Sequence, residues 1–115
     1  MPILTTHILD TINGVPAADV HVRLFALQGN RELLTAAVTN SDGRTKDRML
    51  DRDHIETSRF ELEFDIGPYF ARRGGTTHQP AFLDTVIIRF CLQSGISYHV
   101  PLLVSPWSYT TYRGS

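Results

Sequence analysis

The stretch from Ser58 to Ile66, SRFELEFDI, alternates apolar and acidic side chains without a break. A β-strand turns successive side chains to opposite faces, so a period of two residues is typical of a strand with one buried face. A helix repeats every 3.6 residues and would scatter the same apolar residues around its surface. The stretch therefore predicts a half-buried strand. Its inward and outward sets are Phe60, Leu62, Phe64 and Ile66, and Glu61, Glu63 and Asp65.

Similar β-prone runs recur along the chain. Val20–Leu27 alternates in the same way, and Asn13-Gly14 is a turn signal between two runs. Gln93-Ser94-Gly95 is predicted to be the turn of a β-hairpin. The predicted strands are residues 3–10, 20–27, 32–39, 58–66, 81–92, 96–104 and 108–113. Short strands at this spacing favour one domain, residues 1–115, folded as an all-β sandwich of two antiparallel sheets.

Three segments depart from the strand pattern. Gly67–Arg73 predicts one short helix, because Pro68 suits a first turn and Gly74 suits a helix end. Pro101 interrupts a predicted strand and has no N–H to donate, so that strand is predicted to lie at a sheet edge or to be bulged there. Residues 41–57 are charged and irregular, and long loops of this kind are often functional.

Charge and composition exclude several classes of protein. A net charge of -1 leaves no basic excess that would attract nucleic acid or an anionic membrane. No run approaches the roughly 18 apolar residues of a membrane span, and the N-terminus does not resemble a signal peptide. The single cysteine, Cys91, lies in the apolar run VIIRFCL and is predicted to be a buried, inert thiol. We expect a cytoplasmic protein with neither nucleic acid nor a membrane as partner.

Five histidines are candidates for chemistry. None has the H-x-x-x-H or H-E-x-x-H spacing of a metal site, so no metal is predicted. His21 on a strand, and His54 and His78 in polar loops, are predicted to be solvent-exposed. His7 and His99 each interrupt a strand, and two imidazoles on one surface could serve as general base and proton carrier. The alternative is that each is a strand histidine that faces solvent or contacts the core.

Arg44 follows the tight-turn pair Asp42-Gly43. A turn of this kind could aim the guanidinium at one place, where its paired donors would clamp a planar, carbonyl-rich or anionic ligand. The alternative is a solvated loop arginine.

The C-terminus carries Trp107, Tyr109 and Tyr112, an unusual row for a flexible tail. This row favours a packed last strand, in contact with another subunit. Arg113, Gly114 and Ser115 would then be held near a surface site. The alternative is a frayed end.

Three segments in order, THILDTINGVPA, TNSDGRT and YHVPLLVSPWSYTTYRGS, resemble the 5-hydroxyisourate hydrolases, the urate-pathway enzymes of the transthyretin family. The resemblance covers nearly the whole chain. Its most specific part is the terminal Tyr-Arg-Gly-Ser, which separates the hydrolases from transthyretin, the hormone carrier. The residues that match the family's site pattern are His7, Arg44, His99 and Tyr112 to Ser115. The chain departs from common family residues at Ile8, Val104 and Trp107, and we expect the change at Trp107 to affect packing and not chemistry.

The resemblance implies a reaction and an assembly. The enzyme would hydrolyse a cyclic amide of 5-hydroxyisourate and open its six-membered ring to 2-oxo-4-hydroxy-4-carboxy-5-ureidoimidazoline, in purine degradation, without a cofactor or metal. It would be a homotetramer, a dimer of dimers with active sites at the dimer–dimer interface.

The resemblance also implies roles for single residues. His7 and His99 would position and deprotonate water, and which of them is the base stays open. Arg44 would bind ring carbonyls and stabilise negative charge. Ser115 would orient a histidine through its hydroxyl or terminal carboxylate. Tyr112, Arg113 and Gly114 would hold the substrate.

Two other functions are alternatives. A transthyretin-like carrier would hold a small aromatic ligand in a central channel without catalysis, and it would have no need of two imidazoles and an arginine. A structural or adhesive sandwich domain would have no ligand, and it predicts a monomer with a disordered tail.

Overall fold

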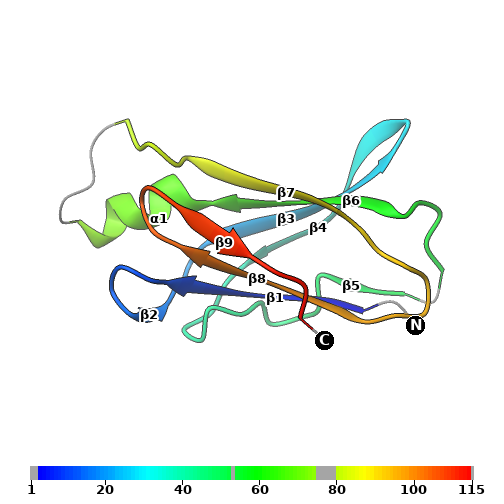
Figure 1. The fold of residues 1–115 in the computed structure, drawn as a ribbon, viewed down its shortest axis with the longest axis horizontal. Helices are drawn as coiled ribbons and strands as arrows, with labels where there is room; N and C mark the ends of the chain where they lie inside the picture. Colours follow the sequence, from blue (N-terminus) through cyan, green and yellow to red (C-terminus); the bar gives the residue numbers. More distant parts are fainter. Residues whose placement is uncertain (1–2, 53, 75–79, 115) are drawn as a thin grey trace.

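Two β-sheets pack face to face in the computed structural model, with one short helix at one end (Figure 1). The structure describes residues 3–52, 54–74 and 80–114. Its elements are β1 (Ile3–Asp10), β2 (Val15–Pro16), β3 (His21–Gln28), β4 (Asn30–Val38), β5 (Leu50–Asp51), β6 (Arg59–Asp65), α1 (Ile66–Arg73), β7 (Thr85–Cys91), β8 (Tyr98–Val104) and β9 (Tyr109–Thr111). The predicted all-β sandwich with one short helix is confirmed.

The first sheet has the strand order β2-β1-β8-β9, with β5 also paired to β1. The second has the order β4-β3-β6-β7. All the pairs are antiparallel except β1–β8, which is parallel. The parallel pair brings the two ends of the chain side by side, since β1 is the first strand and β8 the last but one. This pair positions the candidate site.

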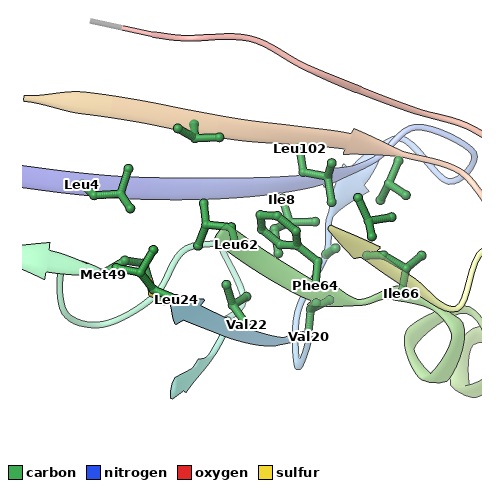
Figure 2. Close-up of a cluster of buried hydrophobic side chains, with 14 of the residues drawn as sticks. Leu4, Ile8, Val20, Val22, Leu24, Met49, Leu62, Phe64, Ile66 and Leu102 are labelled. Carbon is green, nitrogen blue, oxygen red and sulfur yellow. The ribbon is translucent and has the colours of Figure 1, made fainter. Parts of the chain in front are cut away.

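The core lies between the sheets and is built from the inward halves of the alternating strands (Figure 2). Leu4 and Ile8 of β1 and Leu102 of β8 face Val22 and Leu62 of the second sheet, and all five are fully buried. The predicted inward set of β6 is buried as expected. Burial of a large aliphatic side chain stabilises a fold by about 1.5–3 kcal/mol, so this layer fixes the register of every strand that contributes to it.

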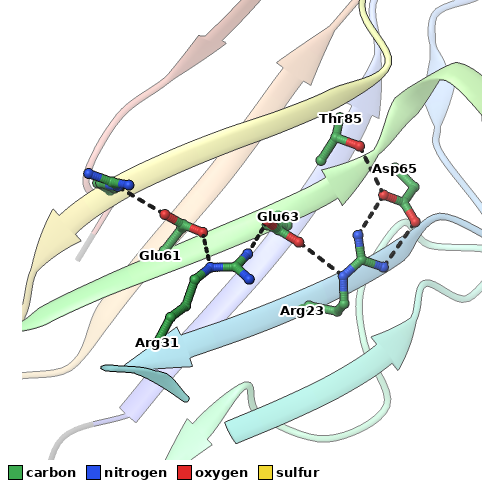
Figure 3. A network of polar contacts seen from close by, with 7 residues as sticks. Arg23, Arg31, Glu61, Glu63, Asp65 and Thr85 are labelled. Carbon is green, nitrogen blue, oxygen red and sulfur yellow. Dashed lines mark hydrogen bonds and ion pairs between the residues drawn. The ribbon is translucent and has the colours of Figure 1, made fainter. Parts of the chain in front are cut away.

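The acidic set of β6 points outward, as predicted, but it is not solvated (Figure 3). Arg31 and Arg89 both bond Glu61, whose side chain is only 3% exposed. Arg23 bonds Glu63 at 3.1 Å and chelates Asp65 at 2.7 and 2.9 Å. Cross-strand ion pairs therefore cover the outer face of the second sheet.

The predicted hairpin at Gln93-Ser94-Gly95 is wrong. The strand before this turn, β7, pairs with β6, whereas β8 pairs with β1 and β9, so the turn carries the chain from one sheet to the other. β7 also begins at Thr85 and not at Ala81. The segment before it serves the helix instead, because the carbonyl of Asp84 accepts hydrogen bonds from the first two N–H groups of α1.

Cys91 is exposed, so the prediction of a buried thiol is wrong. The apolar run around it alternates like any other strand: Val86 and Leu92 are buried, while Ile87 and Cys91 face outward. A continuous apolar run favours burial on both faces, but only the inner face of the second sheet packs against the apolar core.

Of the two alternatives predicted for the strand at Pro101, a sheet edge or a bulge, the sheet edge is wrong, because β8 runs between β1 and β9. The N–H of His99, two residues earlier, faces the tail, the segment from Tyr112 that follows β9, and donates to the carbonyl of Gly114 at 3.2 Å. The nitrogen of Pro101 therefore faces the same side, and the β8–β9 pairing ends at Leu102 and Thr111, next to it. The sheet accommodates the proline through this gap in the ladder.

Helix α1 forms as predicted, with Pro68 in its first turn and Gly74 at its end. Its Tyr69 hydroxyl donates to the carboxylate of Asp10 at the end of β1, at 2.8 Å. Within the described residues, the helical structure is too short and too polar to cross a bilayer.

Candidate active site

His7 and His99 lie on the outer face of the first sheet. Residues 4, 6, 8 and 10 of β1 are buried, so residues 5 and 7 face away from the core. In the parallel register, Thr5 is the partner of His99 and His7 is the partner of Pro101. Paired residues share a face of the sheet, so the two histidines are diagonal neighbours on adjacent strands. Both are half-buried.

The loop after β4 places Arg44 beside His7. Residues 7 and 44 form an antiparallel bridge, and Gly43 accepts a hydrogen bond from the N–H of Ile8 at 2.8 Å. The Asn40 side chain accepts from the N–H groups of Asp42 and Arg44 and shapes the turn. A side chain on Gly43 would lie 2.4 Å from the Ile8 carbonyl, so the turn can reach β1 this closely only with glycine.

The His7 ring is fixed by the same loop. Its Nε2 lies 2.8 Å from the carbonyl oxygen of Asp42. A carbonyl can only accept, so Nε2 carries the proton and donates. In the neutral ring, Nδ1 is then the nitrogen with a lone pair.

The His99 ring is held at its other nitrogen. Its Nδ1 lies 2.8 Å from Thr5 Oγ1. Burial, the positive charge of Arg44 and the charge of His7 lower the pKa of His99, and a hydrogen bond with Thr5 opposes them. The net direction keeps His99 neutral at pH 7, as a general base must be. A neutral His99 has one ring nitrogen with a lone pair that can accept a proton.

The tail after β9 runs back along β8 to the site. Gly114 exchanges two backbone hydrogen bonds with His99, of 2.6 and 3.2 Å. A Cβ on Gly114 would lie 3.2 Å from Cβ and Cδ2 of His99, so glycine allows the backbone to touch the ring. Tyr112 is 58% exposed. The Arg113 guanidinium lies 4.8 Å from the centroid of the Tyr98 ring.

The structure thus brings together four of the predicted site residues, His7, Arg44, His99 and Gly114. Arg113 contacts Tyr98, which neighbours His99 in β8 and so points to the opposite face. Ser115 lies outside the described residues, as does His78. His21 is exposed on the other sheet, as predicted.

Two contributors to the site were not predicted, the Thr5 side chain and the Asp42 carbonyl. Thr5 lies two residues before His7, so the alternation of β1 puts both on one face. Its contact with His99 depends on the parallel pairing of strands 94 residues apart, for which the local pattern holds no signal. In the part of the chain that the structure describes, no three His, Cys, Asp or Glu side chains are grouped as metal ligands.

Relatives with a named activity match almost the whole chain. A 5-hydroxyisourate hydrolase of Deinococcus radiodurans is 47% identical, with 99% of this chain and 97% of that protein covered. A 5-hydroxyisourate hydrolase of Ralstonia nicotianae is 46% identical, with 97% of each covered.

Solved structures agree with these relatives. The 5-hydroxyisourate hydrolase of Klebsiella pneumoniae has a TM-score of 0.80 at 34% identity, with all of both chains covered. An (S)-allantoin synthase has a TM-score of 0.91 at 42% identity, and the match covers 99% of this chain but 44% of that longer chain. Sea bream transthyretin in complex with thyroxine has a TM-score of 0.83 at 25% identity, and the match covers 96% of this chain and 93% of that chain. The HIUase/Transthyretin family model matches residues 4–114, and the chain belongs to this family.

Proposed function

We propose that the protein hydrolyses 5-hydroxyisourate by opening its six-membered ring at a cyclic amide bond, the activity for which its relatives are named. The observation that carries the proposal is the pair of imidazoles beside Arg44 on one sheet face. The two rings are tied at opposite nitrogens, His7 through Nε2 and His99 through Nδ1. His7 therefore carries a proton on Nε2, and His99, held at Nδ1, keeps Nε2 for the reaction. Acid–base catalysis of amide hydrolysis needs such a pair of groups.

His99 is proposed as the general base. Its Nε2 would take a proton from water while the water oxygen bonds to the amide carbon. This step creates a tetrahedral intermediate with negative charge on the former carbonyl oxygen. Collapse of the intermediate breaks the C–N bond, and the proton held by His99 passes to the leaving nitrogen, with His7 positioning the water and relaying the proton. The products contain every atom of substrate and water, and no redox step occurs.

Arg44 is proposed to bind the ring carbonyls and stabilise the oxyanion. Its charge reaches His99, since it lowers the pKa of that residue. A single oxyanion donor is typically worth about 3–4 kcal/mol in kcat. The same charge keeps His99 unprotonated before the reaction, so Arg44 would support both steps.

The tail is proposed to complete the site. Gly114 lies against His99, and Tyr112, two residues earlier in the chain, is exposed, which supports a role for both at the border of a substrate. Arg113 was also predicted to bind substrate; its contact with Tyr98 suggests that it holds the tail in place first. We propose that Ser115 orients one of the two histidines.

We further propose a homotetramer with sites at the dimer–dimer interface, acting in the cytoplasm. The histidines stand on an open sheet face, whereas small-molecule sites are usually concave. A second copy on this face would enclose the substrate. Trp107, Tyr109 and Tyr112, with exposed fractions of 48%, 44% and 58%, would gain cover in such an assembly.

The experiment is the ultraviolet decay of freshly prepared 5-hydroxyisourate with and without nanomolar protein. The substrate also decays unaided, so the rate above background is the measured quantity. We expect a large, protein-dependent acceleration that saturates with substrate. Decay at the background rate by a folded protein would overturn the proposal. Saturable binding without turnover would then favour the carrier function.

A further inference from the structure

Thr5 contacts the His99 ring with its side chain. Its Oγ1 lies 2.8 Å from Nδ1, and the two residues are register partners in the β1–β8 pair. On the ring's other side, Cδ2 faces the tail at Gly114. The imidazole therefore lies between β1, which it contacts through Nδ1, and the tail, which it faces with Cδ2. Both atoms are bonded to Cγ, so Nε2 lies at the opposite end of the ring.

The contact can hold either neutral tautomer, because a hydroxyl both donates and accepts. If the hydroxyl donated to Nδ1, the proton of the ring would sit on Nε2 and His99 could not act as a base there. If Nδ1–H donates to Thr5, the Nε2 lone pair is free. Burial, Arg44 and His7 lower the pKa of His99, and a hydrogen bond with Thr5 opposes them. A hydrogen bond that raises the pKa of a histidine is one in which the ring donates, so its direction agrees with Nδ1–H as the donor to the Thr5 hydroxyl at 2.8 Å.

The next residue shows that the two adjacent threonines have different tasks. Thr6 points into the core, is 2% exposed and donates its hydroxyl to the carbonyl of Val100 at 2.7 Å. This bond joins the Thr6 side chain of β1 to the backbone of β8, so its role is structural. Thr5 is on the outer face, and its hydroxyl meets a titratable ring.

We propose that Thr5 is a positioning residue that holds His99 as the Nδ1–H tautomer and keeps the Nε2 lone pair turned toward the substrate. The inference rests on the proposed hydrolysis, in which His99 is the base. Thr5 touches neither substrate nor water in this role. Such partners of a catalytic histidine fix both its tautomer and its orientation.

The test compares Thr5→Val, which keeps the shape and removes the hydroxyl, with Thr5→Ser, which keeps the hydroxyl. Thr85→Val is the matched control: it makes the same change at a strand threonine on the other sheet, where the hydroxyl bonds Asp65 at 3.4 Å. For Thr5→Val we expect kcat to fall about 10- to 100-fold with KM little changed. Thr5→Ser should restore most of the rate, and Thr85→Val should match the wild type.

The pH profile separates positioning from a general loss of structure. Arg44 and His7 are the charged or titratable groups whose fields act on His99. Without the Thr5 hydroxyl as acceptor, the Nδ1–H of protonated His99 loses a hydrogen bond and the pKa of His99 falls further. Activity that needs neutral His99 should then persist to lower pH, so the acid limb of kcat/KM shifts to lower pH in Thr5→Val. Unchanged kcat and an unchanged acid limb would overturn the inference.

A measurement without substrate keeps the inference independent of the proposed function. The ¹⁵N chemical shifts of the His99 ring in the wild-type protein at neutral pH should show a protonated Nδ1 and a bare Nε2. A protonated Nε2 would overturn the role of Thr5 even if the enzyme is fast. Conversely, a protein that shows the Nδ1–H tautomer but no hydrolysis would contradict the proposed function and leave the positioning by Thr5 intact.

Discussion

At the scale of single residues, the position of Arg44 depends on a backbone that only glycine can supply. Gly43 has a φ of 75°, and its Cα faces the Ile8 carbonyl so closely that a Cβ would lie 2.4 Å from that oxygen. Any side chain there must push the turn away from β1. Since the turn carries both Arg44 and the Asp42 carbonyl that binds His7, the displacement would reach two site residues at once.

We therefore expect Gly43→Ala to lose activity and stability together. Left-handed backbone costs an L-residue about 1–2 kcal/mol, and the clash adds to this. A shift of the guanidinium by about 1 Å can cost roughly 100-fold in rate. Gly29→Ala is the control, because Gly29 has a φ of 71° with open space around its Cα. It should lose stability through backbone strain alone and keep its kcat. Equal kcat for the two variants would contradict this account of the turn.

At the scale of elements, a buried carboxylate joins β1 to helix α1. Asp10 is 1% exposed and accepts hydrogen bonds from Tyr69, from the Asn13 side chain and from the N–H groups of Ile12 and Asn13. Burial alone would raise the pKa of Asp10, but these bonds outweigh it and lower the pKa below its usual 3.8. Burial and Asp10 raise the pKa of Tyr69 to about 12. The bonds thus favour the ionised carboxylate.

The stabilisation by ionised Asp10 depends on pH in a defined direction. Because the folded-state pKa of Asp10 lies below the unfolded value of 3.8, the stabilisation is present above about pH 4 and is lost as pH falls through the folded pKa. We expect Tyr69→Phe to lower the free energy of unfolding by about 1–3 kcal/mol at pH 7, with a smaller loss at pH 3.

Urea unfolding at fixed protein concentration measures the effect. Phe82→Tyr is the control for a single hydroxyl: Phe82 is 76% exposed, and the change should stay within about 0.5 kcal/mol. A Tyr69→Phe loss of the same size at both pH values would show that the hydroxyl does not stabilise the charged form of Asp10.

The element scale is also where prediction from sequence succeeds and then stops. The β6 alternation predicted a strand, its burial and its face, because these follow from local geometry. The turn at residues 93–95 was predicted as a hairpin and is instead a crossover, because local residues do not determine which sheet a strand joins. Glu61 was predicted to face outward and does, yet arginines from two other strands cover it.

The sequence predicts the residues of the candidate site but not how they come together. His7, Arg44 and His99 were picked out by their residue types, by their flanking pattern and by the family resemblance. That two histidines so far apart in sequence become diagonal neighbours follows from the parallel β1–β8 register, which no local signal specifies. The contact of Thr5 with His99 depends on the same register and was missed.

At the scale of the whole molecule, the proposed tetramer makes a prediction about mass. Light scattering behind size exclusion should give four times the 13.0 kDa chain mass, with the same value over a range of loading concentrations. The reason is that an open sheet face with exposed aromatic residues at its edge gains burial only by association. A species of one chain mass that nevertheless hydrolyses the substrate would contradict the enclosed-site account.

The most direct test of the central claim is kcat/KM of His99→Gln for 5-hydroxyisourate, measured beside His21→Gln on the exposed face of the other sheet. General base catalysis contributes about 100- to 10,000-fold, so we predict a loss of that size for His99→Gln with the oligomer intact. His21→Gln should keep the wild-type value. A His99→Gln protein within a few-fold of the wild type would contradict the claim that the β1–β8 face is the catalytic centre.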